Sequence, residues 1–477
     1  MKMKFISVFL LLAGICSGCS DWLDVKPSDR ISEGTAFSTL AGFEEALNGI
    51  YVELNNNSLY GQTLSCEFVE ILAQRYAISE DSKSNYALAN YEYDGALAKS
   101  KIQSIWQTAY NLIANTNLLI KNCEENRAVL SDDYYHLCRG EALALRAMLH
   151  FDLFRLFGPI YGSASVGTSI PYYQEFVLDV NPSLPKEEFM GKVIQDLLNA
   201  EKELEIDPII TYGVQGDSRN VFFQYRNLRL NYYAVQALLA RVYLYVGNTE
   251  KAKEYALKVI EISEKLFPWV DPMTMGSDGS IPDRMFSTEV LFALQNLNRN
   301  TIFTSLFDAQ NLKLQSSLLI PRQDVVRQIF QATGTLSDYR YKYFLSSSVF
   351  EFGGESYVIY DRYQGQDSLY NQMIPMLRTS EMYMIATEVT DDPEEAAGYL
   401  NTLRGQRGLR EIPSSTQVER YLEAEWLKEL YGEGQLFFYY KRKMKTSVQS
   451  AYDPVGTKTI SMLKYVLPIP DGETQYN

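Results

Sequence analysis

The chain has 477 residues, of which 46% are apolar and 22% are charged, and this balance indicates a globular protein that can bury a large core. Its formal net charge of -15 argues against a nucleic-acid partner and against a polybasic membrane-binding patch. No long apolar segment follows the one near the N-terminus.

The first residues have the pattern of a lipoprotein export signal. Two lysines precede an apolar run over residues 5–15, which is too short to span a bilayer as a helix. Ser17 and Gly18 provide the small side chains that a signal peptidase needs directly before Cys19. We therefore expect residues 1–18 to be removed and Cys19 to become a lipidated N-terminus.

Lipidation would anchor the protein to a membrane that it does not span. Each buried methylene of an acyl chain, such as palmitate, contributes about 0.8 kcal/mol, so several chains hold firmly. Residues 19–30 are then predicted to form an acidic tether, in which Trp22 packs back onto the folded domain. The alternative is an ordinary secreted protein with a stray cysteine.

Three further cysteines, Cys66, Cys123 and Cys138, show no spacing of a disulfide framework. An exported protein can form disulfides, so a Cys123–Cys138 pair is one interpretation. Three buried thiols are the interpretation that we favour.

Two segments in the first half of the chain predict long helices. Residues 139–157 carry apolar side chains on two faces, which indicates a helix buried on most sides that ends at Gly158 and Pro159. Residues 186–204 follow Pro185 and have acidic residues in the first turn, where the helix dipole favours them.

Residues 229–262 have the pattern of a tetratricopeptide helix pair. Small residues such as Ala240 and Ala252 recur on both sides of a Gly247-Asn248 break, where two antiparallel helices touch closely. Residues 379–409 repeat this pattern across a short turn. Any amphipathic helix hairpin is the simpler alternative.

The intervening segments predict irregular structure. Residues 76–98 are polar and rich in tyrosine, residues 267–285 carry Pro, Gly and Asp, and residues 331–375 mix short strand-like runs with glycine. No flexible linker divides the chain. We expect one mainly α domain over residues 31–477, a helical-repeat scaffold with long irregular loops and few short strands. Its helix pairs are expected near residues 105–157, 186–262 and 379–440.

No motif of catalysis, cofactor binding or metal binding stands out. The two histidines are His136 and His150, and His150 lies within the predicted buried helix, where packing explains it. Residues 277–283 place acids near a glycine without the spacing of a calcium loop. We expect no metal and no cofactor, although paired carboxylates of a glycosidase cannot be recognised from sequence.

Aromatic residues are the remaining indication of function, since the chain has 35 Tyr, 23 Phe and 4 Trp. Flat rings stack on the C–H faces of sugars, and neighbouring amides bind hydroxyl groups. Most of these rings fall at helical spacing and are assigned to packing. The candidate ligand-binding residues lie in the irregular segments: Asn85, Tyr86, Tyr91, Tyr93 and Trp269. Trp269 could equally close the end of the helix pair that begins at residue 229.

Several segments, taken in order, resemble the SusD/RagB family of outer-membrane nutrient-binding lipoproteins. They are CSDWLDVKP after the signal, RGEALALRAMLHFDLFRLFGPI, LPKEEFMGKVIQDLLNAEKEL, AVQALLARVYLYVGN, STEVLFALQ, MIPMLRTSEMYMIATE, LNTLRGQRGL, EWLKELYGEGQLFFYYKR and YVLPIPDGE. The resemblance implies a SusD-like fold, a tetratricopeptide-like scaffold decorated with loops. It also implies a SusC-like TonB-dependent transporter as partner.

Two places depart from the family pattern. Aligned on Glu433 and Gly434, the positions that usually hold an Arg and an Asp are Leu436 and Tyr439, as if apolar packing replaced an ion pair. The turn over residues 391–393 is shorter than usual.

The resemblance implies a lipid-anchored protein of the cell outer membrane, facing the exterior. It is expected to bind a nutrient glycan without enzymatic activity and to deliver it to the transporter. Peptide capture, an anchored glycoside hydrolase and a purely structural repeat scaffold are the alternatives.

Overall fold

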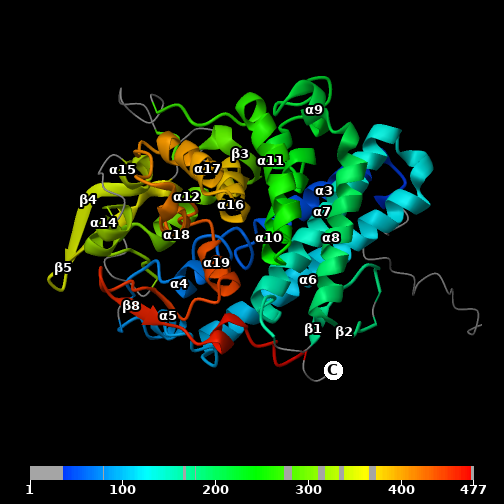
Figure 1. Cartoon of the computed structure of the whole chain (residues 1–477). Coiled ribbons are helices and arrows are strands. Elements are labelled where there is room, and N and C mark those ends of the chain that lie inside the picture. Colours follow the sequence, from blue (N-terminus) through cyan, green and yellow to red (C-terminus); the bar gives the residue numbers. More distant parts are fainter. Residues whose placement is uncertain are drawn as a thin grey trace, which may run out of the picture.

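The computed structural model describes residues 36–78, 80–164, 168–177, 179–272, 282–309, 317–331, 338–364 and 372–473. The predicted signal, Cys19, the predicted tether and most of residues 277–283 lie outside these ranges. The described chain is mostly helical with few short strands, as Figure 1 shows. None of its helices combines the length and the apolar content that a membrane crossing requires.

The helices are α3 (Leu40–Leu54), α4 (Phe68–Leu72), α5 (Lys83–Ala89), α6 (Ala96–Glu125), α7 (Asp132–Phe157), α8 (Lys186–Glu203), α9 (Pro208–Tyr212), α10 (Tyr232–Tyr245), α11 (Thr249–Leu266), α12 (Arg299–Leu306), α14 (Gln323–Gln331), α15 (Tyr339–Phe344), α16 (Thr379–Val389), α17 (Pro393–Gln406), α18 (Val418–Trp426) and α19 (Leu436–Arg442). The strands form four antiparallel pairs: β1 (Thr168–Pro171) with β2 (Ser183–Pro185), β3 (Val290–Gln295) with β6 (Met373–Arg378), β4 (Leu345–Phe352) with β5 (Glu355–Tyr360), and β7 (Ser447–Gln449) with β8 (Thr457–Thr459).

Long helices pack in a row that forms the scaffold. α6 packs on α7, α7 on α8, α8 on α10, α10 on α11, α11 on α16, and α16 on α17 (Figure 1). The chain leaves this row after α11 and returns to it at α16. The buried apolar side chains form a core that runs from Phe37 to Leu467. This arrangement confirms the predicted tetratricopeptide-like fold class.

Small side chains allow the helices of each pair to approach closely. Ala240 on α10 and Ala252 on α11 are fully buried, and Gly247 between the helices has a φ of +77°, which favours glycine. The Asn248 side chain caps α11 by accepting a hydrogen bond from the Lys251 N–H at 3.0 Å. The pattern that predicted this pair therefore has a direct packing cause.

Helix α7 begins at Asp132, seven residues before the start of the helix predicted over residues 139–157. It is buried along nearly its whole length, as its two apolar faces predicted. His150 packs inside it, with its ring stacked on Tyr172 at 3.7 Å between centroids. The Nδ1–H donates to the Arg146 carbonyl at 2.9 Å, and Nε2 accepts from the Tyr173 N–H at 3.1 Å. Burial lowers the pKa of His150 well below its usual value.

The segment over residues 76–98 is more regular than the sequence indicates. It contains α5 and the start of α6. Only Leu88 and Ala89 of α5 are buried, so this helix has no apolar periodicity that would predict it. The strand-like runs predicted within residues 331–375 correspond to β4 and β5. Gly353 and Gly354 turn between these strands with φ values of +63° and +83°.

Leu436, Tyr439 and the three cysteines, about which the sequence made predictions, lie in the core. Leu436 is buried, and the Tyr439 ring stacks on Trp426 at 4.9 Å, so apolar packing occupies the positions of the usual ion pair. The thiols of Cys66, Cys123 and Cys138 are free and buried, and the Cys123–Cys138 disulfide does not form.

A buried cluster of ion pairs holds the helical row against the strands. Glu429, after α18, accepts hydrogen bonds from Arg340 at 2.8 Å, Arg378 at 2.7 Å and Arg407 at 2.7 Å. All four side chains are fully buried. Burial by itself raises the pKa of Glu429, but Arg407 and Arg378 outweigh it and hold that pKa well below the usual value.

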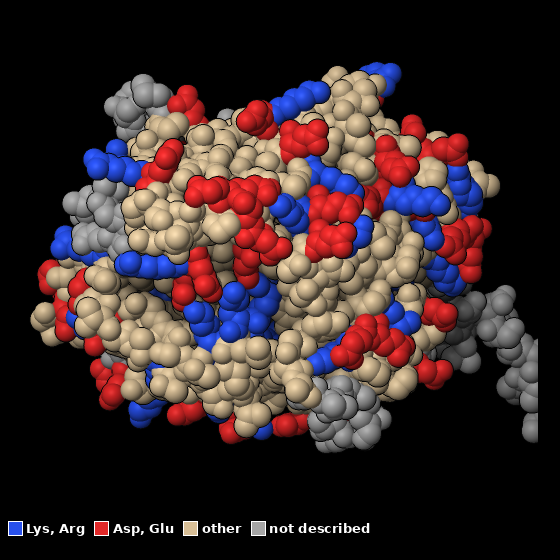
Figure 2. All heavy atoms as spheres, in the orientation of Figure 1, with Lys and Arg blue, Asp and Glu red and all other residues tan. Residues whose placement is uncertain are grey.

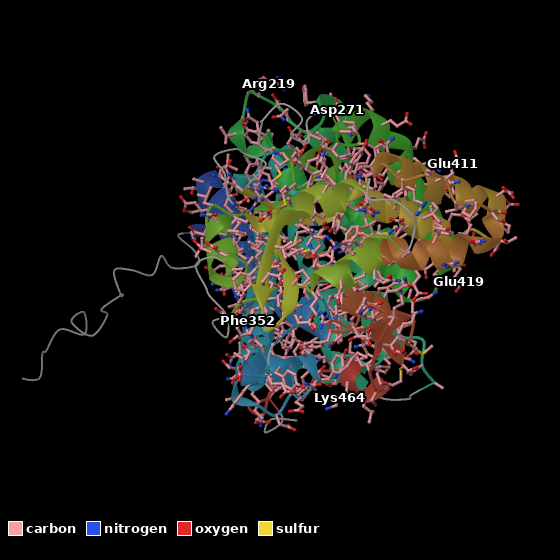
Figure 3. All side chains as sticks on the ribbon, turned by 90° about the vertical axis from the view of Figure 1, so that its left-hand side faces the viewer. Arg219, Asp271, Phe352, Glu411, Glu419 and Lys464 are labelled. Carbon is pink, nitrogen blue, oxygen red and sulfur yellow. The ribbon has the colours of Figure 1, made fainter. Side chains whose placement is uncertain are left out.

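Replacing Glu429 should therefore destabilise the protein strongly. Glu429→Ala leaves buried guanidinium groups without their carboxylate, and a loss of about 3–5 kcal/mol in the free energy of unfolding is expected. Denaturant unfolding measures it. Glu419→Ala is the matched control, since Glu419 is exposed on α18 (Figure 3) and should change stability by no more than about 0.5 kcal/mol. Equal losses in the two variants would contradict the role of the cluster.

A second buried carboxylate, Glu70 on α4, has a weaker set of partners. It accepts the Gly434 N–H at 2.9 Å, and Arg75 Nε lies 3.4 Å from its other oxygen. Burial raises the pKa of Glu70 to about 7, although Arg75 and the Gly434 N–H lower it. Because the pKa of Glu70 is raised in the folded protein, its protonated carboxyl contributes fully to stability below the pKa that it has in the unfolded chain. This contribution is lost as the pH rises through about 7.

We expect Glu70→Gln to remove this pH dependence. Relative to the parent, the variant should gain free energy of unfolding as the pH rises from about 4.5 to about 7, by about 1.4 kcal/mol for each unit of pKa shift. Denaturant unfolding at a series of pH values measures the difference. A difference that is independent of pH would contradict the raised pKa.

Candidate functional site

Three neighbouring hollows form a groove beside the end of α3. The largest has a volume of about 1010 Å³, and it shares lining residues with hollows of about 270 Å³ and 490 Å³. We call the three together the amide groove. Its polar lining includes Asn48, Asn55, Asn57, Gln62, Asn85, Gln224, Gln295, Asn296, Asn298, Thr301, Ser305 and Ser317.

The first wall is the sequence that follows α3. Asn55 caps this helix, and its side-chain N–H donates to the Tyr51 carbonyl at 3.2 Å. Asn56 accepts from the Ser58 N–H at 3.0 Å, and the Asn57 carbonyl accepts from the Thr63 hydroxyl at 2.6 Å. Asparagine side chains form such turns readily. The Asn55 Oδ1 is buried, and no donor among the described residues reaches it.

The opposite wall is the short connection between β3 and α12. Gln295 is the last residue of β3, and Asn296 accepts from the Asn298 N–H at 2.9 Å before α12 begins at Arg299. Between them Leu297 is 72% exposed. An exposed leucine flanked by amides offers a ligand both an apolar contact and hydrogen bonds.

The floor of the groove contains one buried acidic residue, Glu67. Its Oε2 accepts from Gln62 Nε2 at 2.9 Å and from Lys101 Nζ at 2.8 Å. The carboxylate is therefore already satisfied within the protein. It holds the side chains of Gln62 and Lys101 in place.

The smallest hollow carries an exposed aromatic ring at its edge. Tyr225 is 43% exposed, and its backbone has a φ of +49°, which is unusual for a residue with a large side chain. Val221 nearby is 80% exposed. Strained backbone is concentrated at functional sites, so the Tyr225 ring is a candidate platform for a ligand.

The groove suits an uncharged ligand that has many hydroxyl groups. Each amide side chain offers two donors and an acceptor, so one residue can bind two neighbouring hydroxyls. Exposed side chains of Tyr225, Val52 and Leu297 can cover the apolar faces of sugar rings.

The structure separates the residues that the sequence singled out. Asn85 lines the hollow of about 490 Å³. Tyr86 follows it on α5, is partly buried, and its hydroxyl donates to Glu80 at 3.2 Å. Tyr91 and Tyr93 are only 3% and 6% exposed, so they pack in the core. Trp269 follows α11 and packs against Tyr383 of α16, at 5.0 Å between ring centroids.

The sequence reasoning missed most of the groove. The runs NNNS at residues 55–58 and QNLN at residues 295–298 are amide-rich signals that were available. Nothing local shows that they face each other, because more than two hundred positions separate them along the chain.

The histidines and acids of the described residues provide no metal-binding cluster. His136 pairs with Glu203 at 2.6 Å near the surface, and His150 is the core residue described above. A separate hollow of about 390 Å³ lies between α6 and residues 171–180, with Trp106, Tyr110 and Tyr173 in its lining. It also contains three acidic residues, so it is less suited to an uncharged ligand than the amide groove.

Comparison with known families gives a match over the first part of the chain. The family described as "Starch-binding associating with outer membrane", a SusD-like family, matches residues 21–202. Two similar proteins are the SusD-like proteins P25 and P2 of Formosa agariphila. P25 is 25% identical over 213 residues, and P2 is 25% identical over 264 residues. The matches cover 43% and 54% of this chain. They span only 38% and 46% of the relatives' lengths.

Solved structures match over almost the whole chain. A SusD superfamily protein from Bacteroides thetaiotaomicron has a TM-score of 0.72 at 24% identity, over 92% of this chain and 98% of that one. A SusD-like carbohydrate binding protein from Bacteroides vulgatus has a TM-score of 0.69 at 18% identity, over 92% and 96% of the two chains. At these identities the likeness establishes the fold.

Proposed function

We propose that the chain is a SusD-like, non-enzymatic binding protein that captures an oligosaccharide in the amide groove and delivers it to a SusC-like TonB-dependent transporter. The observation that carries the proposal is the groove itself. Amide side chains from separate parts of the chain meet there beside exposed apolar side chains. The family description associates its members with starch binding and the outer membrane.

Tyr225 is proposed to act as a stacking platform at one end of the groove. Its exposure and its left-handed backbone support this role. Asn57 and Asn298, which are exposed on the two walls, are proposed to bind hydroxyl groups of the same ligand. Small-molecule sites commonly combine aromatic side chains, which provide apolar contact, with a few polar groups that orient the ligand.

Removing the ring should weaken glycan binding. Tyr225→Ala is expected to lower the affinity for a bound oligosaccharide by about tenfold, since an aromatic contact contributes about 0.5–1.5 kcal/mol beyond its buried area. Isothermal titration against a panel of oligosaccharides and peptides measures it.

Tyr212→Ala is the control, because Tyr212 is 51% exposed on α9 and lines none of the three hollows. Binding to peptides alone would refute the glycan proposal and favour peptide capture. Release of product from an oligosaccharide, abolished by an acid-to-amide change, would favour an anchored glycosidase.

We propose that Cys19 is lipidated and that the protein is anchored in the outer membrane, facing the exterior. The sequence pattern before Cys19 supports the lipid anchor, and the family description supports the outer membrane as the location. Residues 19–30 would then tether the folded domain to the bilayer, beside the transporter that receives the ligand.

A tagged chain purified in detergent from outer membranes should bring a TonB-dependent barrel with it. Cys19→Ala should lose acyl labelling and leave the membrane fraction, because the anchor is gone. Cys16→Ala, within the predicted signal, is the control and should be labelled as the parent is. Recovery of the anchored protein alone would count against the transport partnership.

A further inference from the structure

We infer that the amide groove selects uncharged oligosaccharides and rejects chains that carry uronate or sulfate groups. The inference rests on the proposed function and specifies its ligand class. It comes from the charges of the groove lining, taken one hollow at a time.

Among the described residues, the largest hollow has no basic residue in its lining. Among its fourteen described lining residues, Glu67 alone carries a charge, and the others are amides, hydroxyls and aliphatic side chains. An anionic sugar placed here would lose water without gaining a cation. Burying a charge without a partner is costly, and the nearby Glu67 carboxylate adds repulsion.

Two of the three described cations at the two ends, Lys101 and Arg229, are already engaged within the protein. Lys101 donates to Glu67 at 2.8 Å, and its side chain is only 18% exposed. Arg229 pairs with the fully buried Glu141 at 3.2 Å and donates to Asn48. Pairing Arg229 or Lys101 with a ligand carboxylate would require breaking one of these contacts.

Asp81, in the lining of the hollow of about 490 Å³, also disfavours an anionic ligand. Asp81 and Lys83 both line the hollow of about 490 Å³, so that end has no excess of positive charge. The chain as a whole carries a net charge of -15. Figure 2 shows acidic and basic side chains close to one another over one face of the molecule.

Neutral sugars meet none of these costs. Asn57 and Gln62 on one side, with Gln295 and Asn298 on the other, can exchange hydrogen bonds with hydroxyl groups in place of water. Hydroxyl groups are both donors and acceptors, so amides match them without any change of charge.

The test compares matched oligosaccharides that differ only in charge. Gluco-, galacto- and manno-hexasaccharides are titrated beside the same chains with their primary hydroxyls oxidised to carboxylates. Whichever neutral chain binds should bind at least about tenfold more tightly than its oxidised counterpart, a difference of about 1.4 kcal/mol. Its loss of affinity in Tyr225→Ala assigns the binding to the groove.

A second test measures the two affinities, for the neutral and the oxidised chain, in the Glu67→Gln variant. The substitution removes the acid and releases Lys101, so the ratio of the two affinities should shift towards the oxidised chain by several-fold. Glu53→Gln is the matched control, because Glu53 is exposed on α3 and lines none of the three hollows, and it should leave the ratio unchanged.

Tighter binding of the oxidised chain in the groove would overturn the inference while leaving the proposed function intact. Failure of every chain, neutral and oxidised, to bind the parent protein would refute the proposed function and the inference with it.

Discussion

Glu429 accepts hydrogen bonds from Arg340, Arg378 and Arg407 in a place from which water is excluded. Such a carboxylate is costly to bury, and it is stable only because the geometry with its partners is complete. Arg378 ends β6, whose partner strand β3 runs to Gln295 at the groove. The position of one groove wall therefore follows from an ion-pair cluster in the core.

The other wall depends on a similar arrangement. Glu141 of α7 accepts from the Tyr51 hydroxyl at 2.7 Å and from Arg226 at 2.8 Å. Tyr51 lies one turn before the end of α3, and Arg226 follows Tyr225 directly. Burial raises the pKa of Glu141, but Arg226 and Arg229 outweigh it and lower that pKa overall. Two buried carboxylates thus fix the backbone on which the exposed amides and the strained tyrosine stand.

Helical periodicity and small-residue spacing were sufficient to predict the scaffold, because α7, α10 and α11 bury continuous faces against their neighbours. The site was harder, since its walls meet only through long-range contacts. Tyr93 illustrates the difficulty: its hydroxyl donates to the Lys464 carbonyl at 2.7 Å, a contact that no local pattern reveals. Asn85 could be chosen because it lies in a polar segment near the groove, whereas Tyr225 and Asn298 gave no comparable signal.

The scarcity of charge among the described lining residues of the largest hollow has a consequence for the effect of salt on binding. Dissolved ions screen interactions between exposed charges, over about 10 Å at 0.1 M, and they leave hydrogen bonds between amides and hydroxyls largely unaffected. A surface of this kind would hold a neutral nutrient equally well in fresh, brackish or marine water. Its affinity is set by shape and hydrogen bonding, and a change of salinity leaves both in place.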